Sequence, residues 1–225
     1  MVPVLVSVIV PVFNGARFLA ECIESLTGQD HPAVEVIVVD AGSTDGSGDL
    51  AATFSRVRLL RRTYESIGAS RNAGIGAATG SLIGFCDSDD MWRPGKARRQ
   101  VAYLQARPDV AIVLCRQETV FEPGVPWPAW LRPDQVRGDL DGVSAMSGLF
   151  RRAVFDRLGG VRAAEIGADF EHGLLYRARA AGLKIEVLEE LLTLRRIHDA
   201  NTTTRQGSSL PLMFTSVRDH LRSRR

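Results

Sequence analysis

The stretch VIVVDAGSTDGS, from Val36 to Ser47, decides the fold. It opens with branched apolar residues at successive positions, a pattern typical of a strand that is buried on both faces. Asp40 ends this strand, and the Gly, Ser, Thr and Asp residues after it favour a tight turn. A buried strand that ends on a carboxylate indicates a parallel sheet with a ligand site at its carboxyl edge.

The rest of the first half repeats this pattern. VLVSVIVPVF (Val4–Phe13) predicts a strand, and residues 16–29 predict a helix with one apolar stripe. Further strands are expected at 56–62 and 81–87, with helical stretches before each of them. Asn14, Asp40 and Asp87 would then follow the carboxyl ends of three strands. The sequence therefore predicts an α/β fold with a Rossmann-like, mostly parallel central sheet flanked by helices.

The second half is less regular. Residues 94–106 predict a helix, DVAIVLC a strand, and the Pro-rich stretch Phe121–Gln135 a long irregular loop. GADFEHGLLYRARAAG predicts a helix that ends at Gly182, and LKIEVLEELLTLRRIH predicts extended edge segments. We expect one domain over residues 1–207, with halves 1–106 and 107–207, followed by a helical tail at 208–225.

Composition excludes some classes of function. A net charge of +2 over 225 residues argues against a dedicated nucleic-acid binder. The three cysteines show neither paired nor metal-ligand spacing, which favours a reducing compartment. The first residues lack a basic leader and a small-residue cleavage site, and no apolar run reaches about 18 residues. We expect a cytoplasmic protein with at most a peripheral contact to membranes.

The run GFCDSDDMW carries the clearest chemical signal. Asp87, Asp89 and Asp90 directly follow a predicted buried strand. Two acids spaced by one residue can point at one hard divalent cation, which prefers oxygen ligands. A polar turn with helix-capping aspartates is the alternative, but the position at the end of a central strand favours the metal site.

Four segments together carry a resemblance to a known family: SVIVPVFNGARFLAECIESL, EVIVVDAGSTDGS, ASRNAGIGAATGSLIGFCDSDDMW and GADFEHGLLYRARAAG. Their order resembles that of family 2 glycosyltransferases, which have the GT-A fold. The resemblance is dense over residues 5–106 and looser over 144–201. It implies an inverting enzyme with a nucleotide-sugar donor and Mn²⁺ or Mg²⁺. Residues 1–106 would be the nucleotide-sugar-binding half, and 107–207 the acceptor-side half with the catalytic helix.

The resemblance also implies roles for single residues. The segment along the nucleoside would comprise Pro11, Phe13 and Asn14, with Asp40 near the base and Arg71 near base and phosphate. In the D-x-D, Asp89 would bind the metal and Asp87 the ribose or the metal. His198 is similar to a late histidine that approaches the metal or the diphosphate.

The acceptor side is implied in the same way. Sugar transfer needs a base that takes the proton of the acceptor hydroxyl. In the family this is the aspartate of a Glu-Asp pair, and the matching positions here are Ala168 and Asp169. Asp169 is the predicted base, with Glu171 in reserve. Other candidate contacts, each with a packing alternative, are His172 for the acceptor, Trp92 for the sugar pocket, and Trp127 and Trp130 for a stacking wall.

Two departures from the family, at Ala41 and Ala168, keep alternatives open. Many relatives have a second acid after Asp40 that accepts a hydrogen bond from the base ring, and this chain has Ala41. A UDP-linked donor is expected, but Ala41 weakens that inference, and the acceptor could be a glycan, a lipid-linked glycan, a peptide or a small molecule. The rivals are a nucleotidyltransferase and a non-catalytic sugar-nucleotide-binding partner protein.

GIGAATG (Gly74–Gly80) resembles a dinucleotide fingerprint, but it does not follow the first strand, so close helix packing is the better interpretation.

Overall fold

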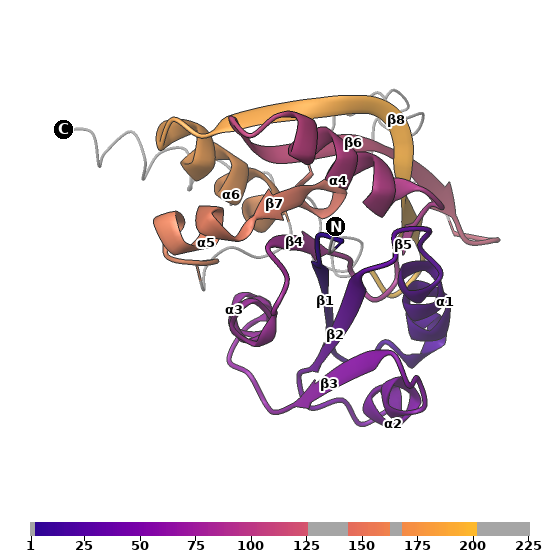
Figure 1. Ribbon diagram of the computed structural model, residues 1–225. Coiled ribbons are helices and arrows are strands. Elements are labelled where there is room, and N and C mark those ends of the chain that lie inside the picture. The colour runs from indigo at the N-terminus through magenta and orange to yellow at the C-terminus, as the bar shows by residue number, and fades with distance from the viewer. Residues whose placement is uncertain (1–2, 126–143, 163–167, 202–225) are drawn as a thin grey trace.

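The computed structural model describes residues 3–125, 144–162 and 168–201. In these residues one eight-stranded sheet forms the centre, in the order β3-β2-β1-β4-β7-β6-β8-β5. Helices cover both of its faces, as Figure 1 shows. The mixed α/β architecture predicted from the sequence is therefore confirmed.

The sheet is mostly parallel. Strands β3, β2, β1, β4, β6 and β8 run in one direction, and β7 and β5 run opposite to them. The strands are β1 (Val6–Val12), β2 (Val34–Asp40), β3 (Val57–Arg61), β4 (Leu82–Phe85), β5 (Met91–Trp92), β6 (Val110–Phe121), β7 (Leu149–Arg151) and β8 (Lys184–Ile197).

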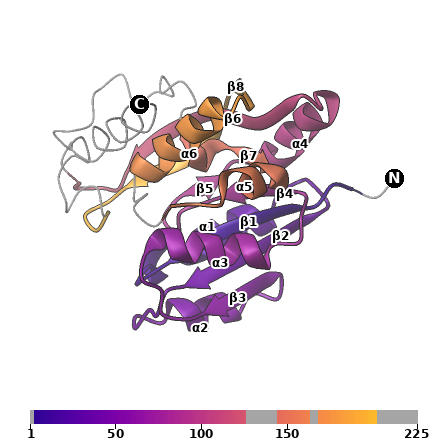
Figure 2. The ribbon, with the colours of Figure 1, turned by 90° about the vertical axis from the view of Figure 1, so that its left-hand side faces the viewer.

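The helices divide between the two faces. On one face lie α1 (Ala16–Thr27), α2 (Ser47–Ala52) and α4 (Lys96–Ala106). On the other lie α3 (Ile67–Ala77), α5 (Arg152–Leu158) and α6 (Ala168–Ala180), the face turned toward the viewer in Figure 2. A short 3₁₀ turn, η2 (Ala145–Ser147), precedes β7.

Successive residues of the central strands serve the two cores. Val8 and Val10 of β1 pack with the α1 side, and Ile9 packs with the α3 side. This alternation is why the strand is apolar at every position. The predicted stripe of α1 is confirmed, because its buried residues are Phe18, Leu19, Cys22, Ile23 and Leu26.

Two small features explain how a proline and a glycine are tolerated at the centre. The carbonyl of Ile9 accepts from Cys86 N–H, and alternation aims the nitrogen of Pro11 to the same side, beyond the end of β4. No ladder donor is needed there. On α3, a Cβ at Gly74 would lie 2.4 Å from Ile9, so the glycine allows close helix–sheet contact, as the sequence predicted.

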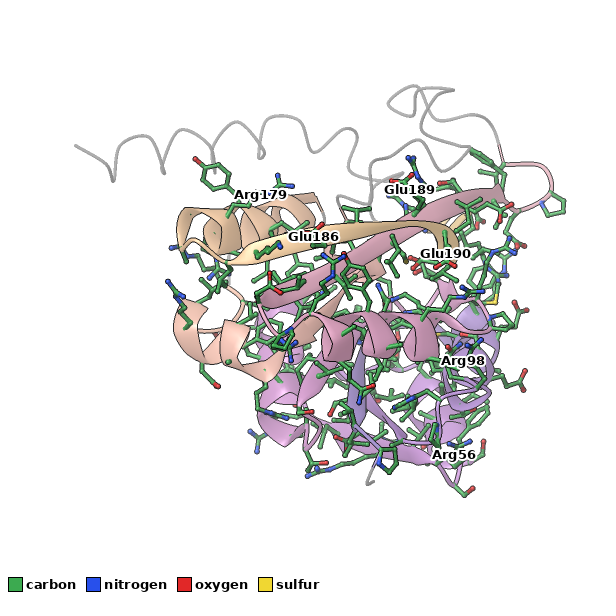
Figure 3. The ribbon with its side chains drawn as sticks, turned by 45° about the horizontal axis from the view of Figure 1, so that its top comes forward. Arg56, Arg98, Arg179, Glu186, Glu189 and Glu190 are labelled. Carbon is green, nitrogen blue, oxygen red and sulfur yellow. The ribbon has the colours of Figure 1, made fainter. Side chains whose placement is uncertain are left out.

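Several details differ from the sequence prediction. The strand predicted from DVAIVLC continues to Phe121, and β8 pairs with β6 along its length and with β5 only at Thr193 and Leu194. β8 is therefore an edge only in its first part, where Figure 3 shows Glu186, Glu189 and Glu190 along it. Trp127, Trp130 and the predicted tail at 208–225 lie outside the described residues.

Among the described residues, no helix is both long and apolar enough to cross a membrane.

Candidate active site

The turn after β2 is joined to the loop after β1. Asp45 acts as a capping residue: its carboxylate accepts from the N–H of Ala16, the first residue of α1. The carboxylate thus gives an acceptor to one of the N–H donors that have no partner within the helix at its start. Three more hydrogen bonds of 2.9–3.0 Å join the two loops, and with the Asp45 bond they form what we call the clasp. Asn14 N–H donates to Ser43 Oγ, Thr44 N–H to Asn14 Oδ1, and Gly15 N–H to Ser47 Oγ.

Asp40 has more protein partners than the sequence indicated. Its side chain is 2% exposed, Oδ1 accepts from Ser43 N–H at 2.9 Å, and Oδ2 lies 3.6 Å from Nε of Arg61. A Cβ at Gly48 would come within 2.3 Å of the same Oδ2. Both oxygens thus face protein groups, and the carboxylate stabilises this edge of the sheet.

Arg71 lies at the junction of the two halves. Its guanidinium is 2% exposed, donates from Nη2 to Asp87 Oδ1 at 3.0 Å, and lies 3.9 Å from the ring centre of Phe170 on α6. Its Nε and Nη1 are buried and have no hydrogen-bond partner in the described part of the chain. Buried donors without acceptors are costly, which indicates a place for an anion or a carbonyl oxygen.

Asp89 meets two side chains from the end of β8. His198 Nε2 lies 3.0 Å from Asp89 Oδ2, and Nδ2 of Asn201 donates to the same oxygen at 2.9 Å. Ala200 N–H donates to Nδ1 of His198, so the proton of a neutral ring lies on Nε2 and faces Asp89. The sequence predicted that Asp89 and His198 share one site. It missed Asn201, which carried no spacing signal.

Asp90 shapes the loop after β4. It is buried, and its Oδ1 accepts from Arg196 N–H at 2.9 Å. Burial raises the pKa of the Asp90 carboxyl well above its usual range, and the neighbouring charges of Asp89 and Asp87 raise it further. The Asp90 carboxyl group thus bonds to the end of β8, two residues before His198, rather than facing a ligand.

The side chains that could bind a metal here suit a divalent cation only in part. The described residues contain no group of three or more His, Cys, Asp or Glu arranged to hold a metal. They do bring a carboxylate and an imidazole together, at Asp89 and His198. Mg²⁺ and similar ions are often held by one or two protein ligands, with water and substrate phosphates completing the shell. The residues fit such a shared site, in which Asp87 is already paired with Arg71.

The remaining predicted residues lie at different depths. Pro11 is buried within β1, whereas Phe13, just past the carboxyl end of β1 at the rim of the sheet, is 65% exposed. Asn14 is exposed and has a positive φ of 51°, and its amide oxygen is used in the clasp. Asp169 is the second residue of α6, in its first turn, and His172 lies one turn further along.

Trp92 is a correction to the sequence prediction. It was expected to line a sugar pocket, but it is 2% exposed and belongs to the core under α1 and α4. Its indole N–H donates to the carbonyl of Phe85 at 3.3 Å, and Nζ of Lys96 lies 4.0 Å from the centre of its ring. The indole ring packs in the core and bonds to Phe85 at the end of β4, where the D-x-D loop begins.

Comparison with sequences places these features in context. The family model described as Glycosyl transferase family 2 matches residues 7–159. The uncharacterized glycosyltransferase alr2836 of Nostoc is 30% identical over 213 residues, which cover 87% of this chain and 66% of that protein. The uncharacterized glycosyltransferase EpsJ of Bacillus subtilis is 42% identical over 94 residues, covering 40% of this chain and 27% of that protein. The chain thus spans less than two thirds of these relatives.

Solved structures share the fold. TarS 1–349 of S. aureus, solved in complex with UDP-GlcNAc, has a TM-score of 0.75 at 20% identity, over 95% of this chain and 64% of that one. The mannosyltransferase PcManGT of Pyrobaculum calidifontis, in complex with GDP-Man and Mn²⁺, has a TM-score of 0.71 at 23% identity, over 89% and 59%. The predicted GT-A fold is confirmed by these neighbours.

Proposed function

Because this chain belongs to glycosyltransferase family 2, we propose that it transfers a sugar from a nucleotide diphosphate donor to an acceptor hydroxyl, with inversion and with Mn²⁺ or Mg²⁺. One observation carries the proposal. Asp89 meets His198 and Asn201, which are 109 and 112 residues away in sequence, at the carboxyl edge of the sheet. Ligands of open α/β sheets bind at this edge.

Asp89 and His198 are the residues that would hold the cation. His198 would bind it through Nε2 in the Nδ1–H tautomer, for which the Ala200 N–H must release Nδ1. When bound, a divalent cation supplies Lewis-acid stabilisation of a departing diphosphate. Asp87 keeps its ion pair with Arg71 in this scheme, and it faces the ribose or completes the metal site. The neighbour PcManGT was solved with Mn²⁺, which supports a divalent ion in this fold.

Arg71 supports the binding of an anionic donor. Its guanidinium has two buried donors without a partner in the described residues, and it faces Asp87 at the end of β4. A phosphate or a base carbonyl would satisfy those donors by charge-assisted hydrogen bonds. An arginine that is already fixed by Asp87 and Phe170 loses little conformational freedom on binding.

The nucleoside would lie along Pro11, Phe13 and Asn14. The exposed ring of Phe13 offers an apolar face at this rim. The protein partners of Asp40 direct it to the turn rather than to the base, and Ala41 has no acceptor, so backbone groups would select the base. TarS was solved with UDP-GlcNAc and PcManGT with GDP-Man. A UDP-linked hexose or N-acetylhexosamine is our first choice of donor, with GDP-linked sugars next.

Asp169 is the proposed base, which takes the acceptor proton as the hydroxyl attacks. Its neighbour Phe170 packs on Arg71 and, edge to face at 5.3 Å, on Phe85. These contacts tie the first turn of α6 to the donor side, which supports the assignment. His172, one turn further, would contact the acceptor.

The acceptor class is left open among a glycan, a lipid-linked glycan, a peptide and a small molecule. We place the reaction in the cytoplasm, because the three cysteines are free thiols although the sulfurs of Cys22 and Cys86 lie only 3.8 Å apart. Family membership favours sugar transfer over nucleotidyl transfer. Ala41 and Ala168 make a non-catalytic sugar-nucleotide binder the alternative that an experiment must exclude.

Replacement of Asp89 by alanine tests the metal site. UDP binding to the wild-type protein should be at least about 10-fold tighter with Mn²⁺ than with EDTA, and Asp89→Ala should lose this difference. Titration calorimetry measures both, with Asp109→Ala, an exposed partner of Lys184, as the control. Equal affinity of Asp89→Ala and wild type in both conditions would exclude Asp89 as a ligand.

A further inference from the structure

A buried arginine lies two residues before His198 on β8. The side chain of Arg196 is 7% exposed and forms ion pairs with Glu21 of α1 and with Glu122, which directly follows β6. Its Nε is buried and lacks a partner in the described residues. Burying a guanidinium costs free energy that two carboxylates only partly offset, so the position is expensive if it serves packing alone.

Phe18 connects this arginine to the histidine. The guanidinium carbon of Arg196 lies 4.4 Å from the centre of the Phe18 ring, and the ring of His198 lies 4.6 Å away, tilted by 50°. Arg17 approaches the same ring at 4.6 Å and pairs with Asp199. One aromatic ring on α1 therefore fixes both the cation of Arg196 and the imidazole.

The main chain of Arg196 reaches the acidic loop directly. Its N–H donates to Asp90 Oδ1 at 2.9 Å, and its carbonyl accepts from Nδ2 of Asn201 at 3.2 Å. The same Asn201 nitrogen donates to Asp89. Arg196 thus lies where α1, the end of β6, the end of β8 and the D-x-D loop come together.

We propose that Arg196, seated on Phe18, is a positioning residue that holds His198 against Asp89 and so sets the geometry of the cation site. The proposal rests on the proposed function for the identity of the ligand. The side chain of Arg196 acts through Phe18, Glu21 and Glu122. Partners that orient a metal ligand typically change metal affinity by about 10- to 100-fold when they are removed.

The first measurement is of Mn²⁺ affinity. Arg196→Met keeps the apolar stem but removes the cation, and we expect it to weaken Mn²⁺ binding at saturating UDP by about 10-fold, followed by the EPR signal of free Mn²⁺. UDP affinity in EDTA should change less than about threefold. Arg116→Met, which breaks the pair between Arg116 of β6 and Glu189 of β8, is the matched control and should match wild type. Mn²⁺ affinity of a folded Arg196→Met within twofold of wild type would overturn the proposal.

A second measurement needs neither metal nor activity. In the ligand-free wild type, ¹⁵N-edited NMR of the imidazoles should show His198 as the Nε2–H tautomer, and Arg196→Met should mix the tautomers. If Arg196→Met fails to fold, the double variant Glu21→Gln with Glu122→Gln removes the same ion pairs from more exposed positions, together with the Arg17–Glu122 pair. An unchanged tautomer in that variant contradicts the proposal. Because the tautomer is observed without Mn²⁺, it decides the role of Arg196 even if the wild type takes up no metal.

Discussion

At the scale of single residues, two carboxylates of this chain differ because their partners differ. Asp40 faces Ser43 N–H and Arg61 in the interior, whereas Asp89 faces His198 and Asn201 at a partly open site. The first arrangement fixes a turn, and the second brings together side chains from the loop after β4 and the segment after β8. In the sequence, Asp40 ends a strand and Asp89 closely follows one, so position along the chain does not separate their roles and their partners do.

The structural role of Asp40 predicts a loss of stability. Asp40→Asn removes a charge that pairs with Arg61 and accepts from Ser43, and it should lower the free energy of unfolding by about 1–3 kcal/mol. Urea denaturation measures this. Asp49→Asn, an exposed partner of the same arginine, should change stability by less than about 0.5 kcal/mol. A fully stable Asp40→Asn protein with altered preference among UDP, GDP and ADP would instead make Asp40 the base contact.

The sequence identified the chemistry of single residues better than their partners. Asp89 and His198 were predicted to share a site and do so, because their roles came with recognisable motifs. Asn201, Arg61 and Arg196 were missed or left without partners. Each acts through a contact with a distant segment, and nothing in local spacing indicates which segment that is. The sugar-pocket role predicted for Trp92 was wrong for the same reason, because the burial of its ring depends on how α4 packs.

At the scale of elements, α4 carries an unusual group. Lys96 is fully buried, donates to Gln100 Oε1 at 2.6 Å and lies over Trp92, and burial lowers its pKa from 10.5 to about 8. In the unfolded chain the amine keeps its ordinary pKa. Between about pH 8 and 10.5 the unfolded chain therefore holds a proton that the folded chain lacks, and stability rises with pH across this window.

This linkage predicts a measurable slope. The free energy of unfolding should gain roughly 3 kcal/mol from Lys96 between pH 8 and 10.5, and Lys96→Met should lack that gain. Urea denaturation at several pH values gives both curves. Lys184→Met, which removes an exposed lysine, should keep the rise. Parallel curves for wild type and Lys96→Met would show that the buried amine keeps an ordinary pKa.

Elements with one clear periodicity were the most predictable. The predicted apolar stripe of α1 is confirmed, and β1 and β2 lie where their apolar runs are. The 14-residue β8 was expected only as edge segments. Its pairing with both β6 and β5 depends on long-range register, which a charged segment with Glu186, Glu189 and Glu190 does not reveal.

At the scale of the whole molecule, one sheet brings two halves of the chain to a single edge. β4 and β1 come from residues 1–106, and β6 and β8 from residues 107–207, with β7 between β4 and β6. Arg71 with Phe170, and Asp89 with His198, are among the contacts that cross between the halves. A site built in this way can bind a donor on one side and hold a base on the other.

The most direct test of this account is turnover of donor. Wild-type protein with Mn²⁺ and a panel of UDP- and GDP-linked sugars should release the free nucleoside diphosphate from at least one of them. Asp169→Asn should bind that donor with about the same affinity and lose turnover by at least about 100-fold, since the base is removed. Normal turnover of Asp169→Asn would move the base elsewhere, with Glu171 next. Donor binding without any turnover, unchanged by Asp169→Asn, would contradict the enzyme and make the chain a sugar-nucleotide binder.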